Sequence, residues 1–301
     1  MRLDYDQLPF LERVKRIAII AMFSDDRLMD ELVLKGGSAL DIAYQASSRA
    51  SLDVDFSMGD AFESLDALRE RISRCLQQTF QEHGLVVFDM QLTERPPGLT
   101  DDVRDFWGGY LVEFKISTPH DFASYGGDIE ALRRHAVPMT PNNSTKFTID
   151  ISKHEFRREK VAVEIDGYTV FVYSPKMIVG EKVRAICQQL PQYGPIVKRG
   201  RAGAARARDF LDIYVGCETL GVDFTQPHFH EIVREMFLAK RVPLSMIGEI
   251  ESQREFHRPD FVSVQATVKP DFGLKSFDEY FDYVVEKCRA LEVLWKVDPP
   301  I

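Results

Sequence analysis

The sequence predicts an α+β protein in which a mixed β-sheet flanked by helices precedes a mostly helical lobe. Short β-type runs and amphipathic helical segments alternate along the first part of the chain. The pattern changes at Ser174-Pro175, after which apolar residues recur mainly at helical spacing. We therefore expect one unit over residues 1–174 and a second over residues 175–301, and 301 residues suffice for both to bury apolar cores.

The first unit is expected to contain two long helices and several strands. Apolar residues at helical spacing predict one helix over residues 8–30 and another ending at about His83. Asp60 and Glu63 have the spacing of a capping box before the second helix. Asp166-Gly167 is a strong hairpin signal. Strands are predicted over residues 32–35, 51–56, 85–92, 110–117, 146–152, 161–165 and 168–173.

Between the strands of the first unit, residues 128–135 are expected to form a short helix. The second unit is expected to consist of helices. Helical spacing predicts helices over residues 176–190 and 202–220, separated by a loop. A final helix should begin at Ser276, because Ser276 and Glu279 match a capping box and an apolar stripe follows them.

Composition and charge narrow the class of protein. The formal net charge of −9 argues against a protein that coats nucleic acid non-specifically, although it leaves room for a local basic patch. The four cysteines are scattered, with no CxxC pair and no Cys/His cluster, so neither a disulfide framework nor a zinc site is expected. No apolar run approaches the roughly 20 residues of a membrane span, and no signal peptide is recognised. We expect a cytoplasmic protein with no membrane partner.

One short stretch combines two features that can act together. An apolar run ends in Lys35-Gly36-Gly37-Ser38 and continues into a helical pattern, which predicts a strand, a tight turn and a helix. Backbone N–H groups of such a turn can approach an anion closely because glycine has no Cβ, and the helix start adds partial positive charge. The turn is therefore a candidate phosphate cradle, and an ordinary glycine turn is the alternative.

The second feature follows at Asp53-Val54-Asp55-Phe56. Alternation along a strand puts Asp53 and Asp55 on one face and the apolar residues on the other. Adjacent carboxylates repel each other unless a cation lies between them, and Mg²⁺ is usually held by one or two carboxylates together with substrate phosphates. A solvated strand face is the alternative. Together with the glycine turn, the pair indicates phosphoryl or nucleotidyl transfer.

These two blocks resemble a known family. Lys35-Gly36-Gly37-Ser38-Ala39-Leu40, followed by Arg49-Ala50-Ser51-Leu52-Asp53-Val54-Asp55-Phe56, closely resembles the AbiEii-type nucleotidyltransferase toxins of the DNA polymerase β-like superfamily. Two further blocks, around Lys182 and over residues 208–214, resemble the family's helical lysine motif and its Arg-Asp-x-x-Asp-x-Tyr motif. The resemblance implies the nucleotidyltransferase fold, with the helical lobe completing the active-site cleft.

Further site residues are suggested by chemistry and by this resemblance. A third carboxylate on a neighbouring strand would help to clamp two metal ions, and Asp150 is the candidate, matching a strand aspartate of the family. Lys182 lies among apolar helical positions, so it either extends to solvent or, as the resemblance implies, contacts the triphosphate. Asp209 would then orient Lys182 or the nucleotide. Arg208 and Asp212 are spaced i,i+4, and a surface ion pair is the alternative for them.

The remaining features concern the acceptor and regulation. Ser51 either caps its strand or, as in some relatives, is modified to silence the enzyme. We also count it, with the glycine turn and Lys182, among the nucleotide-binding residues. The loop Pro191–Arg208 contains no acidic residue. It is either a solvated loop or binds a phosphate backbone, and the resemblance suggests tRNA as the acceptor. Its basic residues are Lys198, Arg199, Arg201, Arg206 and Arg208.

The resemblance thus implies a Mg²⁺-dependent nucleotidyltransferase toxin of an abortive-infection, type IV-like toxin–antitoxin pair. It would transfer NMP from an NTP to an RNA 3′ end, with tRNA as the expected acceptor, block translation and growth, and be neutralised by a cognate antitoxin. Asp53 and Asp55 would hold metal, with Asp150 assisting and activating the 3′-hydroxyl. Two alternatives stay open: the same fold modifying a protein or a small molecule, and a non-catalytic module that binds GTP or an antitoxin.

Overall fold

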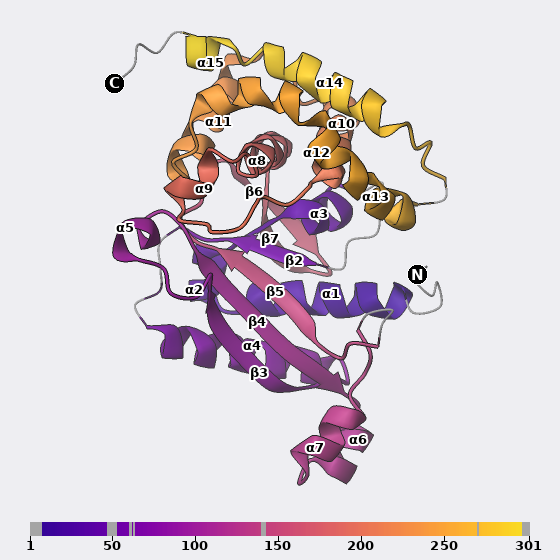
Figure 1. Cartoon of the computed structure of the whole chain (residues 1–301). Coiled ribbons are helices and arrows are strands. Elements are labelled where there is room, and N and C mark those ends of the chain that lie inside the picture. Colours follow the sequence, from indigo (N-terminus) through magenta and orange to yellow (C-terminus); the bar gives the residue numbers. More distant parts are fainter. Residues whose placement is uncertain are drawn as a thin grey trace.

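A computed structural model describes residues 8–46, 53–59, 62, 64–139, 143–269 and 271–296. It confirms the expected class, because a mixed seven-stranded sheet is flanked by helices and followed by a helical lobe (Figure 1). The strands are β1 (Val33–Lys35), β2 (Val54–Ser57), β3 (Val86–Arg95), β4 (Gly109–Ser117), β5 (Phe147–Ser152), β6 (Lys160–Ile165) and β7 (Tyr168–Tyr173). Their order is β3-β4-β5-β2-β1-β7-β6. The β1–β7 and β2–β5 pairs are parallel and the other pairs are antiparallel.

Helices of very different length surround this sheet. The first unit contains α1 (Leu8–Met22), α2 (Asp26–Glu31), α3 (Gly36–Ser38), which runs into the π-helical turn η1 (Ala39–Ala43), α4 (Leu65–Glu82), α5 (Asp101–Arg104), α6 (Pro119–Tyr125) and α7 (Ile129–Arg134). The second contains α8 (Pro175–Cys187), α9 (Tyr193–Ile196), α10 (Ala207–Glu218), α11 (Pro227–Ala239), the 3₁₀ turns η2 (Leu244–Gln253) and η3 (Arg258–Asp260), α12 (Arg254–His257), α13 (Phe261–Thr267), α14 (Phe277–Arg289) and α15 (Val293–Lys296). None of these helices, within the described ranges, is long and apolar enough to cross a membrane.

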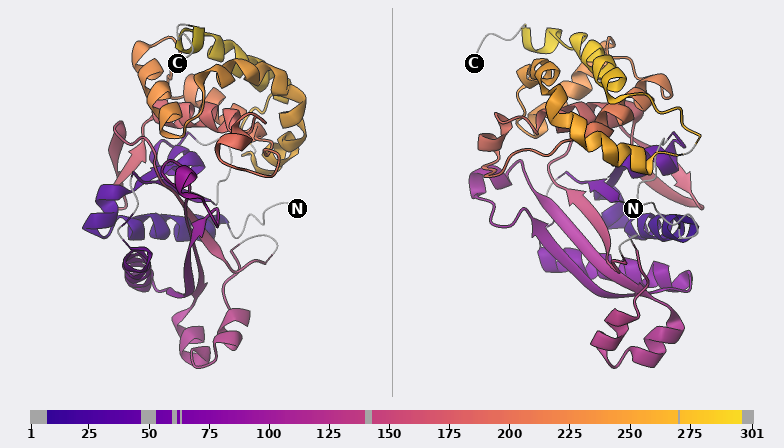
Figure 2. Two further views of the ribbon diagram at one scale, coloured as in Figure 1. Left: turned by 60° about the vertical axis from the view of Figure 1, so that its left-hand side comes forward. Right: turned by 45° about the vertical axis from the view of Figure 1, so that its right-hand side comes forward.

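Alternation along the central strands separates an apolar face of the sheet from a polar one. Leu34 and Phe56 are buried in the core that also contains the apolar side of α1, where Phe56 packs against Phe23. Lys35 and Asp55, the neighbouring residues along β1 and β2, point instead towards α8. The long helices α1 and α4 therefore lie on one side of the sheet, while the helical lobe sits over β1 and β7 (Figures 1 and 2).

Apolar side chains form two main cores. The first joins α1, α4 and the sheet, and it also takes in Met177 and Ile178 of α8 and Ile232 of α11. The second belongs to the helical lobe from Val179 onwards and takes in Val103 from α5. Each core thus includes side chains from the other part of the chain, and the division into residues 1–174 and 175–301 stays a prediction.

Several local predictions are confirmed. The hairpin between β6 and β7 turns at Asp166-Gly167, where both residues have positive φ, 50° and 85°. The short helix α7 is capped by the side chain of Asp128. The final helix α14 carries the predicted capping box between Ser276 and Glu279. These signals are short-range, and each acts within a few residues of the element it defines.

The predicted continuous helix over residues 8–30 is wrong. α1 ends at Met22, and α2 begins only at Asp26. Asp25 is extended, with φ −123° and ψ 127°, and its carboxylate accepts hydrogen bonds from the N–H groups of Arg27 and Leu28. An aspartate that satisfies the first N–H groups of a helix starts that helix rather than continuing the preceding one.

Three other boundaries also differ from expectation. The helix predicted over residues 202–220 starts five residues later, at Ala207. β3 continues to Arg95, past the predicted end at residue 92, because it stays paired with β4 as far as Gly109. α4 is capped by Ser64, while the predicted capping residues 60 and 63 lie outside the described residues.

We predict that Asp25→Ala lowers the free energy of unfolding by about 1–2 kcal/mol, since it removes a helix cap and two partly exposed ion pairs, with Arg71 and Arg74. Asp26→Ala is the matched control, because Asp26 is exposed in the first turn of the same helix; its effect should stay below about 0.5 kcal/mol. Urea denaturation measures both values. An equal loss for the two variants would contradict the assigned role of the cap.

Candidate active site

The glycine turn follows β1 directly and closes onto β2. Gly36 has φ +67°, a left-handed conformation that favours glycine. A Cβ at this position would lie 2.8 Å from Oδ2 of Asp55. Glycine is therefore required for two reasons, the backbone conformation and the close approach of a carboxylate.

Ser38 joins the same turn to the aspartate strand. Its hydroxyl is buried and donates a hydrogen bond of 2.5 Å to the backbone oxygen of Asp53. Gly36 and Gly37 are buried as well. The turn and the two aspartates predicted to act together are thus physically connected.

Strand pairing brings a lysine and two carboxylates into one row. Lys35 on β1 pairs with Asp55 on β2, and Asp55 pairs with Asp150 on β5. Residues opposite each other on adjacent strands point to the same face, and neighbouring strands lie about 4.8 Å apart. Asp53 directly precedes β2, and its charge acts on both Asp55 and Asp150, so it lies near that face too. The structure therefore places the three predicted metal-binding carboxylates together.

The pKa values of Asp55 and Asp150 are both raised. Desolvation is the main cause of the raised pKa of Asp55, and the charges of Asp53 and Asp150 add to it, while Lys35 and Lys182 oppose it. Asp150 is exposed at the edge of the row, but neighbouring groups still desolvate its carboxylate enough, with the charge of Asp53, to raise its pKa. The carboxylates of Asp53, Asp55 and Asp150 therefore carry more negative charge than Lys35 and Lys182 compensate.

This donor set fits a divalent cation, although the site is not preformed. Among the described residues, no three His, Cys, Asp or Glu side chains converge closely enough to enclose an ion by themselves. Carboxylate oxygens with uncompensated charge are nevertheless the ligands that Mg²⁺ prefers, and Mg²⁺ commonly takes its remaining ligands from water and substrate phosphates. Asp53 and Asp55, with Asp150 beside them, are the residues that could hold it.

Lys182 of α8 is buried beside the row and held by two carboxylates of α10. Its Nζ lies 3.0 Å from Asp209 and 3.2 Å from Asp212. Burial works to lower the pKa of Lys182, but these two charges outweigh it and raise that pKa. Only 5% of Lys182 is exposed, so the alternative in which this lysine extends to solvent is wrong.

The i,i+4 alternative for α10 is also wrong. Asp212 is 3% exposed and faces Lys182, so it is no part of a surface ion pair. Arg208 is about half exposed and its guanidinium lies 4.0 Å from Asp53. Asp209 is fully buried and bonded to Arg206 as well as to Lys182. Desolvation opposes its ionisation, but these two cations lower the pKa of Asp209 and keep it charged.

Lys35 belongs to a buried ionic network that the sequence did not reveal. Its Nζ lies 3.2 Å from the hydroxyl of Ser152, 3.5 Å from Glu181 and 3.7 Å from Glu155. Two more cations reach Glu155, Arg184 at 2.8 Å and Lys240 at 3.6 Å. Lys35 was predicted to bind the nucleotide, whereas its ammonium is directed at these carboxylates and stays next to Asp55.

The start of α10 is held by two side chains whose role the sequence did not predict. The backbone N–H of Arg206 donates to Nδ1 of His257 over 3.0 Å, and that of Ala207 donates to Asp260 over 2.9 Å. This attachment explains why residues 202–206 are not helical. It also sets the position of Asp209, and through it that of Lys182.

Several basic side chains of the predicted basic loop are bonded to other parts of the protein. Lys198 forms an ion pair with Asp102 at 2.7 Å, and Arg199 donates to the backbone oxygen of Gln188 over 3.0 Å. Arg206 is occupied by Asp209, Arg208 lies near Asp53, and Arg201 is exposed. Of these five basic residues, Arg208 is the one placed beside the carboxylates with its guanidinium about half exposed. Ser51 lies outside the described residues.

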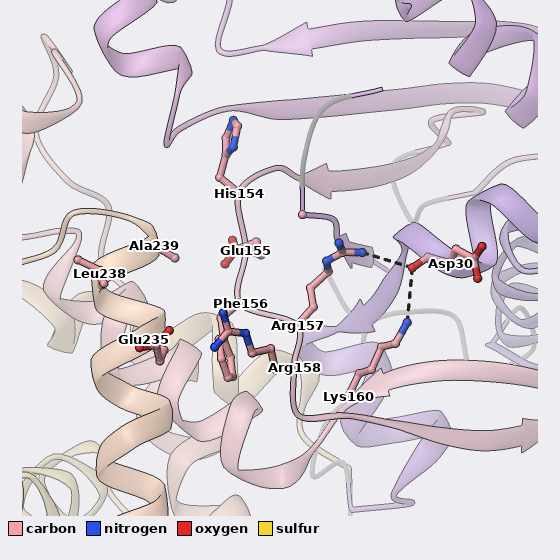
Figure 3. A pocket seen from close by; sticks show the side chains of 11 residues that line it. Asp30, His154, Glu155, Phe156, Arg157, Arg158, Lys160, Glu235, Leu238 and Ala239 are labelled. Atoms are coloured by element: carbon pink, nitrogen blue, oxygen red, sulfur yellow. Dashed lines mark hydrogen bonds between the residues drawn. The ribbon is translucent and has the colours of Figure 1, made fainter. Parts of the chain in front are cut away.

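The hollow drawn in Figure 3 lies elsewhere in the molecule. It has a volume of about 560 Å³ and opens between the β5–β6 connection and the end of α11, with Arg157 and Lys160 bonded to the backbone oxygen of Asp30. Its lining does not include any of the three carboxylates of the row. Glu155 links this hollow to the site, through its contact with Lys35.

Comparisons with known proteins concern the family and the fold of the chain. A family model described as "Nucleotidyl transferase AbiEii toxin, Type IV TA system" matches residues 18–283. MenT4, a nucleotidyltransferase toxin from Mycobacterium tuberculosis H37Rv, has a similar structure with a TM-score of 0.51 and 13% identity, covering 97% of this chain and 86% of its own. JHP933 from Helicobacter pylori gives a TM-score of 0.48 and 14% identity over 97% of this chain and 94% of its own. No curated protein matches the sequence.

We predict that the folded protein loses stability as the pH falls from 7 towards 5, because burial lowers the pKa of His257 to about 4. In this interval the unfolded chain binds a proton that the folded chain excludes, so the free energy of unfolding should fall by about 2 kcal/mol at pH 5 from this group alone. His257→Gln keeps a hydrogen-bond acceptor that does not titrate. Urea denaturation at several pH values should give a flatter pH profile for this variant, and identical profiles would contradict the prediction.

Proposed function

Because this chain belongs to the AbiEii family of nucleotidyltransferase toxins from type IV toxin–antitoxin systems, we propose that it transfers NMP from an NTP to the 3′ end of an RNA. The observation that supports this most strongly is the row formed by Lys35, Asp55 and Asp150 on three adjacent strands. It lies between a glycine turn suited to phosphate and a lysine held in its charged form.

In the proposed complex the triphosphate lies between the glycine turn and α8. Backbone N–H groups of Gly37 and Ser38 bind phosphate oxygens, and Lys182 neutralises the charge of the leaving pyrophosphate. Asp209 keeps Lys182 in place, since the two groups lie 3.0 Å apart. Mg²⁺ held by Asp53 and Asp55 would neutralise charge on the triphosphate and orient it.

The chemical step is a displacement at the α-phosphorus. The 3′-hydroxyl oxygen of the acceptor forms a bond to this phosphorus, the bond from phosphorus to the oxygen shared with the β-phosphate breaks, and pyrophosphate leaves with that electron pair. Asp150 accepts the hydroxyl proton. The raised pKa of Asp150 makes its carboxylate a better base than an ordinary surface aspartate.

The acceptor that we propose is tRNA, and the partner is an antitoxin. Arg208 presents a half-exposed cation 4.0 Å from Asp53, and Arg201 is exposed earlier in the same loop. On a protein whose formal net charge is −9, the two would favour a phosphate backbone locally. The family description names a toxin of a type IV toxin–antitoxin system, which supports an antitoxin as the protein partner. Addition of nucleotides to a tRNA 3′ end would block aminoacylation, and so translation and growth.

We predict that the protein labels RNA when it is incubated with Mg²⁺, total tRNA, total protein and each labelled NTP in turn. Asp55→Asn and Asp150→Asn should lower incorporation by at least about 100-fold, because they remove a metal ligand and the base. Glu164→Gln, an exposed change on β6 away from the site, is the control and should keep full activity. Sequencing of the RNA identifies the extended 3′ ends.

Other outcomes would contradict the proposal in distinct ways. Label in protein or in small molecules but not in RNA would overturn the acceptor and keep the enzyme class. No Mg²⁺-dependent incorporation with any NTP would overturn the enzyme class and favour a binding module.

A further inference from the structure

Part of the catalytic face of the sheet is not covered by the helical lobe. The lobe lies over β1 and β7, whereas β3 and β4 run from their α5 end, which packs against the lobe, away towards α6 and α7 (Figures 1 and 2). On β3 the alternate residues Gln91, Thr93 and Arg95 are all exposed, while Leu92 between them is buried on the other side. This polar shelf, Gln91, Thr93 and Arg95, shares its face with Asp150, because Thr93 pairs with Leu111 and Leu111 pairs with Asp150.

Arg95 lies at the end of this shelf, and no β4 side chain lies between it and the strand that carries Asp150. It pairs with Gly109 on β4, and Gly109 pairs with Ser152, two residues beyond Asp150 on β5. Since Gly109 has no side chain, nothing from β4 separates Arg95 from β5 in this row. The charge of Arg95 reaches Asp150 and opposes the rise of its pKa.

The guanidinium of Arg95 differs from three other cations at the site. Lys35, Lys182 and Arg206 are each bonded to carboxylates of the protein. In the ranges that the structure describes, Arg95 forms no ion pair and no side-chain hydrogen bond. An exposed cation with no internal partner is available to an external anion.

The strand order assigns this cation to one side of the reaction. Asp150 on β5 lies between Asp55 on β2 and Arg95 on β3. The glycine turn and Lys182 lie on the Asp55 side, where the pyrophosphate would leave. The attacking and leaving oxygens of phosphoryl transfer are roughly in line, so the acceptor must approach from the opposite side, which is the side of the polar shelf.

We propose that Arg95 binds the phosphodiester group of the acceptor's last nucleotides, so that a single-stranded RNA 3′ end crosses β3 and β4 to reach Asp150. This inference rests on the function proposed above and specifies the acceptor side of the same site. The hydroxyl of Thr93 and the amide of Gln91 are suited to sugar and phosphate oxygens farther along the strand. Arg95 is a binding residue for the acceptor, and it has no part in binding the NTP.

The test compares Arg95→Gln and Arg95→Lys with Arg69→Gln, in which an exposed arginine on α4, against the opposite face of the sheet, is changed. Initial rates of incorporation are measured against total tRNA and, separately, against NTP, at several salt concentrations. Arg95→Gln should raise KM for tRNA about tenfold and leave KM for NTP within about twofold. The slope of log(kcat/KM) for tRNA against log salt should lose about 0.7, the contribution of one phosphate contact on a single strand. Arg95→Lys should keep most of the affinity.

The outcomes separate this inference from the proposed function. If the unmodified protein extends tRNA and Arg95→Gln behaves like Arg69→Gln in KM and in salt slope, the role of Arg95 is wrong and the function stands. If KM for NTP rises instead, Arg95 belongs to the nucleotide side and the inference is wrong. If the unmodified protein labels no RNA, the proposed function fails, and the inference falls with it.

Discussion

The site depends on one constraint, the register of β1, β2 and β5. That register puts Lys35, Asp55 and Asp150 side by side, so that two carboxylates and a lysine share a row on one face. A slip of one residue in any of these strands would turn its charged residue into the apolar core. The opposite face is pinned by Leu34 and Phe56, which are fully buried, and the cost of exposing them keeps the strands in register.

The helical lobe completes the site by supplying buried counter-charges. Glu155, on the connection after β5, forms ion pairs with Arg184 of α8 and with Lys240 at the end of α11. Lys35 of β1 forms a third ion pair with it. Removing one member of such a group typically costs about 3–5 kcal/mol, because the remaining charge is left buried and uncompensated. Burial lowers the pKa of Lys240 to about 8, although Glu155 opposes this. The same helix α8 that carries Arg184 also carries Lys182, so the packing of α8 against the sheet positions both side chains.

The sequence predicted those parts of the molecule whose signals are local or motif-based. Alternation in Asp53-Val54-Asp55, the glycine turn and the Asp166-Gly167 hairpin each depend on a few consecutive residues, and the family resemblance linked Lys182 to Asp209. The sequence could not predict that Glu155 and His257 support the site, because each meets partners far along the chain and neither stands in a periodic pattern. Glu155, for example, contacts Lys35 and Lys240 only after the sheet and the lobe have packed together. The predicted helix over residues 8–30 failed for a related reason, since apolar periodicity alone does not show that Asp25 takes over the N–H groups of a new helix.

The most direct test of this account is to locate the metal ion. Crystals grown with Mn²⁺ and a non-hydrolysable NTP analogue should give anomalous scattering peaks within coordination distance of the carboxylates of Asp53 and Asp55, with the triphosphate between them and the turn at Gly36–Ser38. Asp53→Asn together with Asp55→Asn should abolish those peaks. Peaks elsewhere on the protein, or a triphosphate bound away from the glycine turn, would contradict the claim that strand register assembles a metal-dependent nucleotidyltransferase site.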